Sequence, residues 1–184
     1  MQWWEILLNV LVVLSSGAMA VFSFFLFKIN RANKNLQDQR ENPRPIVVDT
    51  MAYILLSPRL VVPPGFPRRF HAASHVLHVK LYLSNPGDSP IYLKVLTIDE
   101  WELQDFLIDR SQFIRDPKGD LVVIPPRDKY FLGIDFPLIN FDTAKAKERM
   151  EAGEGEKARL VLEFTGGTKT GKLPIDVKVA GLVL

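Results

Sequence analysis

The feature that most constrains this chain is a run of 22 residues without a charged side chain, Ile6 to Phe27. A helix of that length spans about 33 Å, and the hydrocarbon core of a bilayer is about 30 Å thick. An uncharged run this long, with no polar face, is typical of a membrane segment rather than a globular surface helix. The sequence therefore predicts a single transmembrane helix within residues 1–28.

A cleavable signal peptide is the alternative interpretation of this run. The residues from Gly17 to Ala20 offer a small-residue ending of the kind that signal peptidases cleave. The residues before the run contain no Lys or Arg, however, and the apolar residues continue past Ala20 to Phe27. These flanks favour a retained anchor over a cleaved leader.

The two flanks of the run also predict an orientation. Trp3 and Trp4 lie where aromatic side chains anchor a helix in the membrane interface, and Lys28 and Arg31 can reach the headgroups at the other end. No basic residue precedes the run, whereas five follow it within 17 residues: Lys28, Arg31, Lys34, Arg40 and Arg44. The positive-inside tendency predicts that the N-terminus lies outside and the C-terminal domain lies in the cytoplasm.

One stripe of the predicted helix carries small and polar residues. Its members are separated by 4, 7, 4 and 3 residues and so share one side of a helix: Glu5, Asn9, Ser16, Ala20 and Ser23. Small side chains let helices approach closely in lipid, and Asn9 would gain from an interhelical hydrogen bond. The stripe predicts a docking face for another membrane protein. The alternative is that such residues are ordinary in membrane helices.

The net positive charge of the chain comes from the residues next to the predicted membrane segment. The chain has 23 basic and 21 acidic residues, and residues 1–44 carry five of the basic and three of the acidic ones. The polar basic linker at 29–44 therefore suits anionic lipid headgroups, whereas the domain at 45–184 is neutral. Nucleic-acid binding needs a basic domain surface and is disfavoured. The predicted partners are membrane proteins and the lipid bilayer.

Cysteine is absent from the sequence. Its absence excludes disulfides, thiolate nucleophiles, Cys-ligated zinc, iron–sulfur clusters and thioether-linked haem. No other cofactor or metal is predicted.

From Ile46 onward, apolar and polar residues alternate with the period of a half-buried strand. The expected strands lie at about 46–56, 75–85, 91–95, 121–124, 130–136, 158–164 and 173–179. Thr143 can cap one helix that ends at Gly153, and residues 99–110 fit a strand better than a helix. Seven or so short strands separated by turns indicate an antiparallel β-sandwich with one short inserted helix, in a mainly β chain.

Two stretches of the domain resemble bacterial immunoglobulin-like sandwich modules of the adhesion-related kind. Residues 81–93 place the turn Asn85 to Pro90 between two strands, and residues 123–127 (VIPPR) precede another strand. The resemblance implies an Ig-like fold with a binding or spacer role and no catalytic residues. It also implies a location outside the cytoplasm, against the orientation that the flanks predict. The inserted helix departs from the plain module.

Two patterns resemble ligand sites. The run Gly166 to Lys172 fits G-x-x-x-x-G-K, but Leu173 and Pro174 follow where a phosphate-binding loop needs Ser or Thr and a helix, so a hairpin turn is predicted. The three histidines cluster at His71, His75 and His78. His75 and His78 would point to opposite faces of one strand, so they are expected to be ordinary strand and surface residues.

Five acidic residues form the remaining candidate for chemistry: Asp99, Glu100, Glu102, Asp105 and Asp109. Paired acids could serve a membrane-bound hydrolase, but nothing in the sequence fixes two of them at the required separation. Alternating acids on an exposed strand usually form a solvated face. We therefore expect no catalytic residue and no enzyme activity.

A proline-rich segment, Ser57 to Phe70, is the second predicted interface. Its prolines stiffen the chain, and arginine and phenylalanine are enriched at protein interfaces. The predicted interface residues are Arg59, Val61, Val62, Phe66, Arg68, Arg69 and Phe70. The alternative is a connecting loop that closes one end of the sandwich.

Together these features predict a single-pass membrane protein that is a non-catalytic accessory or scaffolding subunit of a larger membrane complex, such as a bioenergetic assembly. The alternative is a stand-alone membrane-anchored binding module for a soluble protein or an envelope polymer.

Overall fold

The N-terminal part of the chain is one long helix. The computed structural model describes residues 3–56 and 75–183, and α1 runs from Trp3–Glu41. The helix expected at the uncharged run therefore continues through most of the polar segment that we predicted as a linker. It ends just before Pro43, which is consistent with the disfavoured helical conformation of a residue that precedes proline. The chain divides into two compact units, Met1–Arg40 and Glu41–Leu184.

The structure does not support a membrane-spanning assignment for α1. Over the described residues, no helix is both long enough and apolar enough to cross a bilayer. Leu8, Asn9 and Val10, which belong to the predicted span, have side chains outside the described part of the chain.

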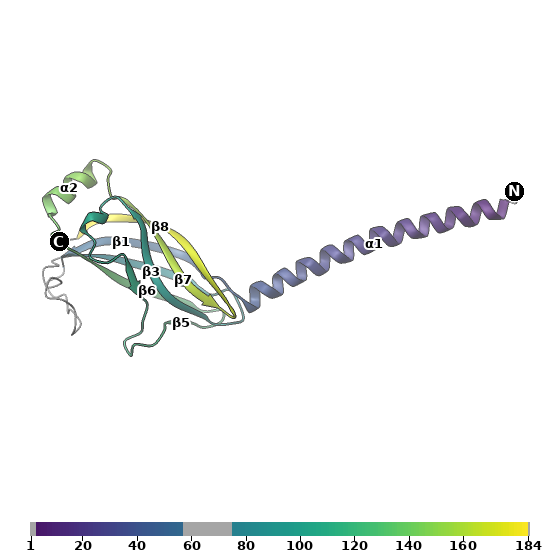
Figure 1. Cartoon of the computed structure of the whole chain (residues 1–184), viewed down its shortest axis with the longest axis horizontal. Helices are drawn as coiled ribbons and strands as arrows, with labels where there is room; N and C mark the ends of the chain where they lie inside the picture. The colour runs from purple at the N-terminus through teal and green to yellow at the C-terminus, as the bar shows by residue number, and fades with distance from the viewer. Residues whose placement is uncertain (1–2, 57–74, 184) are drawn as a thin grey trace. The chain divides into compact units, whose positions relative to one another are not determined.

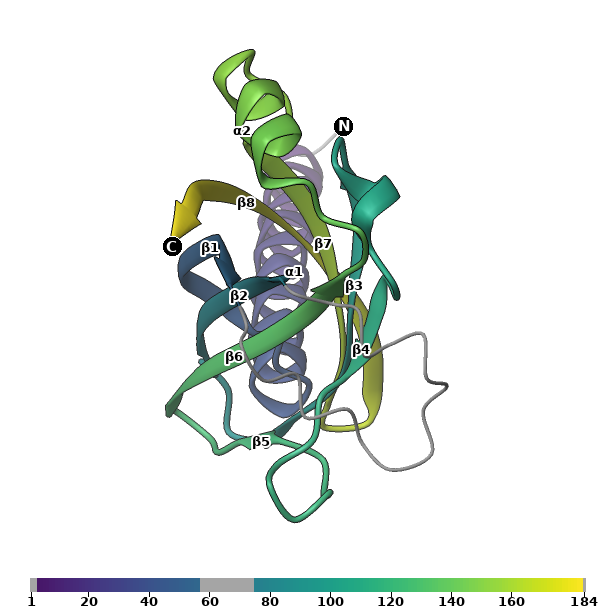
Figure 2. The ribbon, with the colours of Figure 1, turned by 90° about the vertical axis from the view of Figure 1, so that its left-hand side faces the viewer.

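The second unit is mainly β, as predicted. Its described residues form eight strands: β1 (Ile46–Leu56), β2 (His75–Ser84), β3 (Ile91–Trp101), β4 (Ser111–Phe113), β5 (Val123–Ile124), β6 (Lys129–Leu138), β7 (Lys157–Gly166) and β8 (Lys169–Val183). They pair in the order β4-β3-β7-β8-β1-β2-β6, and β5 pairs with β3 off this path. Figures 1 and 2 show that the sheet is strongly curved.

The longest strand joins the two halves of the sheet. Residues 169–178 of β8 pair antiparallel with β7, whereas Val179 and the residues near its end pair parallel with β1. Every other strand pair is antiparallel. Apolar side chains of both halves fill one continuous core, to which Leu77, Leu96, Phe136 and Leu160 contribute fully buried side chains.

Residues 99–110 differ from the predicted strand. β3 ends at Trp101, a short 3₁₀ helix η2 follows at Gln104–Phe106, and β4 then begins. The buried residues of this stretch are Trp101, Leu103 and Phe106. Their mixed spacing of two and three residues fits neither a regular strand nor a long helix, which explains why periodicity gave the wrong element.

The inserted helix α2 (Thr143–Glu151) forms where it was predicted, but its cap differs by one residue. Asp142 is the N-cap, and its carboxylate accepts hydrogen bonds from the backbone N–H groups of Ala144 (3.0 Å) and Lys145 (3.2 Å). Thr143 is the first helical residue instead. Aspartate is as good an N-cap as serine or threonine, so the sequence offered two adjacent candidates.

A buried asparagine holds the turn between β2 and β3 against β5. The Nδ2 group of Asn85 lies 2.9 Å from the carbonyl oxygen of Ser89, 3.1 Å from that of Ile124 and 3.0 Å from that of Pro125. Its Oδ1 accepts a hydrogen bond from the N–H of Gly87. The asparagine turn and the Ile-Pro-Pro stretch that the sequence singled out are thus bonded to each other by one side chain.

Replacing Asn85 with Ala should lower the free energy of unfolding by about 2–4 kcal/mol, because buried carbonyl oxygens would lose their donor. Urea denaturation of the full chain measures this. Ser89→Ala is the matched control, since Ser89 contributes only its backbone to this network, and a change within about 0.5 kcal/mol is expected. Equal losses in the two variants would contradict the role given to Asn85.

Candidate functional site

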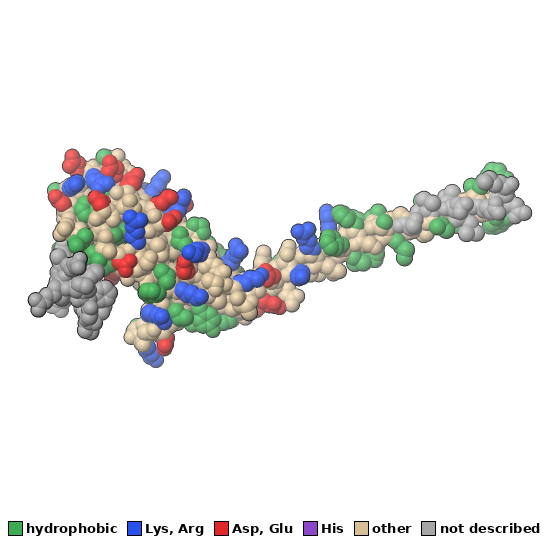
Figure 3. Space-filling view, viewed as in Figure 1, with side chains coloured by type: hydrophobic (Ala, Val, Ile, Leu, Met, Phe, Trp, Pro, Cys, Tyr) green, Lys and Arg blue, Asp and Glu red, His purple; other side chains and the backbone are tan. Residues whose placement is uncertain are grey.

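The surface of α1 is the most unusual surface of the described chain. Phe24, Phe25, Leu26 and Phe27 are consecutive, and each is between 44% and 63% exposed. Successive residues of a helix are rotated by about 100°, so four in a row point to all sides. Figure 3 shows hydrophobic side chains on both visible sides of this helix. A helix that is apolar all round is normally surrounded by an apolar environment.

The predicted interface anchors lie at the two ends of this apolar surface. Trp3 and Trp4 are 85% and 75% exposed. Lys28 and Arg31 are exposed as well, and the Lys28 Nζ lies 4.9 Å from the centre of the Phe24 ring. In this contact the aliphatic part of the lysine covers some of the apolar surface of the helix, and its ammonium group stays in polar surroundings.

The structure tests the two predicted docking surfaces only in part. In the helix stripe, Ala20 and Ser23 are exposed, whereas the side chains of Glu5, Asn9 and Ser16 lie outside the described part. The proline-rich segment lies wholly outside the described residues. So do all of its predicted interface residues: Arg59, Val61, Val62, Phe66, Arg68, Arg69 and Phe70.

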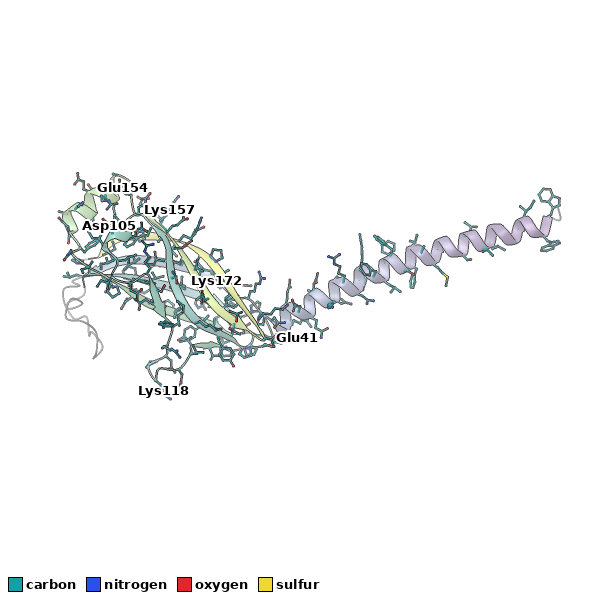
Figure 4. The ribbon with its side chains drawn as sticks, in the orientation of Figure 1. Glu41, Asp105, Lys118, Glu154, Lys157 and Lys172 are labelled. Atoms are coloured by element: carbon teal, nitrogen blue, oxygen red, sulfur yellow. The ribbon has the colours of Figure 1, made fainter. Side chains whose placement is uncertain are left out.

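The glycine-rich turn between β7 and β8 is a hairpin turn, as predicted, and it holds the start of the domain. The Oδ1 of Asn42 accepts hydrogen bonds from the N–H (2.9 Å) and the hydroxyl (3.0 Å) of Thr168. A Cβ atom added to Gly166 would lie 1.9 Å from the carbonyl oxygen of Pro43. Gly167, at φ +57°, has no room for one either. The glycines are needed because another backbone segment passes against this turn. Figure 4 labels Glu41 at this point and Lys172 along the hairpin.

Gly166→Ala should therefore lower the free energy of unfolding by about 3 kcal/mol through overpacking. Lys172→Ala should cost at most about 1 kcal/mol, since Lys172 makes a surface ion pair with Glu163. Thermal unfolding with and without magnesium ATP measures both effects. A sensitive Lys172, an insensitive Gly166 and a shift in Tm with ATP would restore the phosphate-binding interpretation.

The histidines on β2 point to opposite faces, as predicted, and have different partners. His75 is buried, and the centre of its ring lies 4.8 Å from the centre of the Phe141 ring. Its Nε2 lies 3.5 Å from the Thr143 hydroxyl. His78 lies on the outer face and binds Asp135 through Nδ1. The sequence missed this carboxylate because 57 residues separate the pair. Within the described residues, no three potential ligands gather into a metal site, and His71 lies outside that part.

Burial lowers the pKa of His75 from its ordinary value of 6.5, because a charged imidazolium loses its hydration there. The unfolded chain therefore takes up a proton at higher pH than the folded chain does, and folding stability should fall as the pH drops below about 6.5. His75→Gln should flatten this dependence. Urea denaturation between pH 7 and pH 5 measures it, and parallel curves for the two proteins would contradict the assignment.

Four of the five acidic candidates make structural contacts, and the fifth, Asp99, is exposed on β3. Asp105 pairs with Arg149 (3.5 Å), and Glu100 pairs with Arg159 (3.4 Å). The carboxylate of Glu102 accepts a hydrogen bond from the backbone of Gly155. Figure 4 shows Asp105 and Glu154 at the end of the domain where α2 lies.

The remaining contacts of this acidic stretch are also structural. The pKa of Arg149 is raised, chiefly by its hydrogen bond to Glu154. Asp109 accepts a hydrogen bond from the N–H of Ser111 (3.0 Å) at the start of β4. The acid stretch thus braces α2 and the turn before β4 through ion pairs and backbone hydrogen bonds.

Comparison with known proteins gives no family. No protein-family model matches the sequence, and no curated protein matches it. Among solved structures, a crystal structure of beta-glucosidase from Listeria innocua in complex with glucose is similar with a TM-score of 0.26 and 12% identity. The alignment covers 77% of this chain and 16% of that chain. A similarity at that TM-score supports no inference about fold or activity.

Proposed function

We propose that this chain is a non-catalytic accessory or scaffolding subunit of a larger membrane protein complex, anchored by the N-terminal part of α1. The observation that carries the proposal is the ring of exposed apolar side chains at Phe24 to Phe27. In water, each large apolar side chain left exposed forgoes about 1.5–3 kcal/mol of burial. A helix with this surface is stable only where something apolar surrounds it.

A lipid bilayer meets this requirement better than a protein groove does. A groove covers one side of a helix, whereas lipid covers every side. The uncharged run of 22 residues has the length to cross the hydrocarbon core. Trp3 and Trp4 at one end and Lys28 and Arg31 at the other are the residue types that mark the two interfaces. The basic residues after the run favour a cytoplasmic domain with the N-terminus outside.

For the domain, we propose an immunoglobulin-like sandwich. In that fold, strands A, B and E share one sheet and strands C, F and G the other, with an added C′ strand in variable-type domains. If β1, β2 and β6 are taken as A, B and E, then β4, β3, β7 and β8 follow as C′, C, F and G. The parallel contact of β8 with β1 connects the two sheets. The correspondence supports a binding or spacer module.

The contacts of the candidate residues favour a scaffold over an enzyme. His78 is bonded to Asp135, Asp105 pairs with Arg149 of α2, and Glu100 of β3 pairs with Arg159 of β7. These are the arrangements of structural ion pairs, which hold elements of the domain together.

Two surfaces would carry the contacts of this subunit. The first is the helix stripe that includes Asn9, Ser16 and Ala20, where small residues permit close helix packing in lipid. The second is the proline-rich segment from Ser57 to Phe70. The competing function, a stand-alone anchored binding module, needs no partner for the helix stripe.

Leucine substitutions separate the two functions. In the subunit, Asn9→Leu with Ser16→Leu and Ala20→Leu should abolish co-purification of the tagged chain with other membrane proteins from native membranes in mild detergent. The reason is that bulky side chains prevent close helix contact. The matched control carries Ala18→Leu, Val21→Leu and Phe25→Leu on the opposite side of the helix and should retain its partners. Partners that survive both triple substitutions, or that never appear, would favour the stand-alone module.

A further inference from the structure

Among the residues that the structure describes, one edge of the sheet has no strand partner along most of its length. β6 pairs with β2 on one side (Figure 2). On the other side, described hydrogen bonds occur at its two ends. At the start, the N–H of Lys129 donates to the Asp128 carboxylate (2.7 Å). At the end, the Pro137 carbonyl accepts from the N–H of Ile108 (3.1 Å), and the N–H of Ile139 donates to the Phe106 carbonyl (2.6 Å). Backbone groups of successive strand residues point to alternate edges, and the β2–β6 register has no bulge. Odd-numbered residues therefore point their N–H and C=O groups to the open edge: Lys129, Phe131, Gly133 and Asp135.

The middle of this edge lacks the features that usually protect a strand from pairing. Natural edge strands are blunted by charges, prolines, bulges or short length. β6 has ten residues, and the five from Tyr130 to Ile134 carry no charge. Phe131 is 57% exposed, and Gly133 is exposed beside it. A glycine inside a strand often marks a close approach by another backbone. The edge is therefore suited to the addition of a further strand.

We propose that the added strand is β6 of a second copy of this chain, antiparallel and related by a two-fold axis at Leu132. In this register Lys129 lies opposite Asp135 of the second copy, and Phe131 lies opposite Gly133 of the second copy. The symmetry repeats both pairs. Opposite charges that face each other across two strands stabilise the pair, and an aromatic ring can cover the space above a glycine.

Neighbouring two-fold registers lack this match. An axis at Gly133 would place Phe131 opposite Asp135 and Lys129 opposite Pro137. An axis at Phe131 would place the two phenylalanines together and leave Lys129 opposite a glycine. Only the axis at Leu132 pairs both charges and both glycines in this set, so the sequence of β6 is complementary to itself. This self-complementarity favours a second copy over an unrelated peptide as the added strand.

The charged residues of this edge remain accessible for a second partner. The Asp135 side chain is 59% exposed although one of its oxygens binds His78. Lys129 is exposed, and its Nζ lies 5.8 Å from the centre of the Tyr82 ring, a contact that a surface lysine can exchange at small cost.

Charge reversal tests the register. Sedimentation equilibrium of the full chain in density-matched detergent should show a monomer–dimer equilibrium. Lys129→Asp and Asp135→Lys should each weaken it by about tenfold or more, because each creates two like-charge pairs. The double variant K129D/D135K should restore it. Because D135K loses the bond to His78 in both backgrounds, recovery would come from pairing between copies. In detergent, two copies can pair through antiparallel β6 strands without both N-terminal helices having to lie in the same bilayer.

Cysteine cross-linking gives a second measurement, since the chain has no cysteine of its own. The pair K129C/D135C should form an intermolecular disulfide on mild oxidation, because residues directly opposite on paired strands have Cα atoms within disulfide range. The control R159C/T165C has the same spacing on β7, and both of its positions have strand partners on both sides, in β3 and in β8. A strictly monomeric chain, a dimer insensitive to both single reversals, or equal cross-linking in the two pairs would overturn the proposal.

Discussion

The fold depends on the pairing of β8 with strands of both halves of the sheet. Its first ten residues complete the β3–β7 side, and its end pairs parallel with β1. The end of β6 adds a smaller backbone link between the two halves, where Pro137 and Ile139 bond to Ile108 and Phe106. β8 begins at the glycine hairpin, where Asn42 binds Thr168 and the backbone at Pro43 passes against Gly166. The start and the end of the domain are therefore both held by β8 and its hairpin. This explains why a hairpin whose sequence fits the phosphate-loop pattern G-x-x-x-x-G-K has a structural role.

Two described surfaces lack a partner, the apolar side chains of α1 and the open edge of β6, and each needs a different kind of partner. The apolar side chains around α1 need an apolar environment on every side, which supports lipid as the proposed surrounding. The open edge of β6 offers unpaired main-chain groups on one side only, which suits another strand. The two requirements are independent, because the first concerns residues before Lys28 and the second concerns residues 129–135 of the compact domain. A chain that satisfies both would be a membrane-held module that associates through its sheet.

The sequence predicted the elements with strong periodicity and missed contacts that depend on distant residues. The alternation of apolar and polar residues is regular in β1 and β2, so both strands were predicted well. β1 has the predicted bounds, and β2 ends one residue before the predicted end. η2 was missed because Trp101, Leu103 and Phe106 follow no single period, and β4 was missed because its three residues are too few to show one. The bond between His78 and Asp135 joins residues 57 positions apart, and the contact that makes Gly166 necessary comes from Pro43. No local pattern encodes such pairs, so a sequence can indicate a glycine turn but not what passes against it.

The most direct test of the account is whether residues 6–27 cross a membrane. Single cysteines at Gln2, Gly17 and Lys147 can be tested in cells with a maleimide that does not cross membranes, since the chain has no other cysteine. If the helix crosses the membrane as proposed, position 2 should be labelled in intact cells, position 147 only after permeabilisation, and position 17 in neither case. Labelling of position 17 as readily as position 147 after permeabilisation would show that this helix is in water and would contradict the proposed anchor.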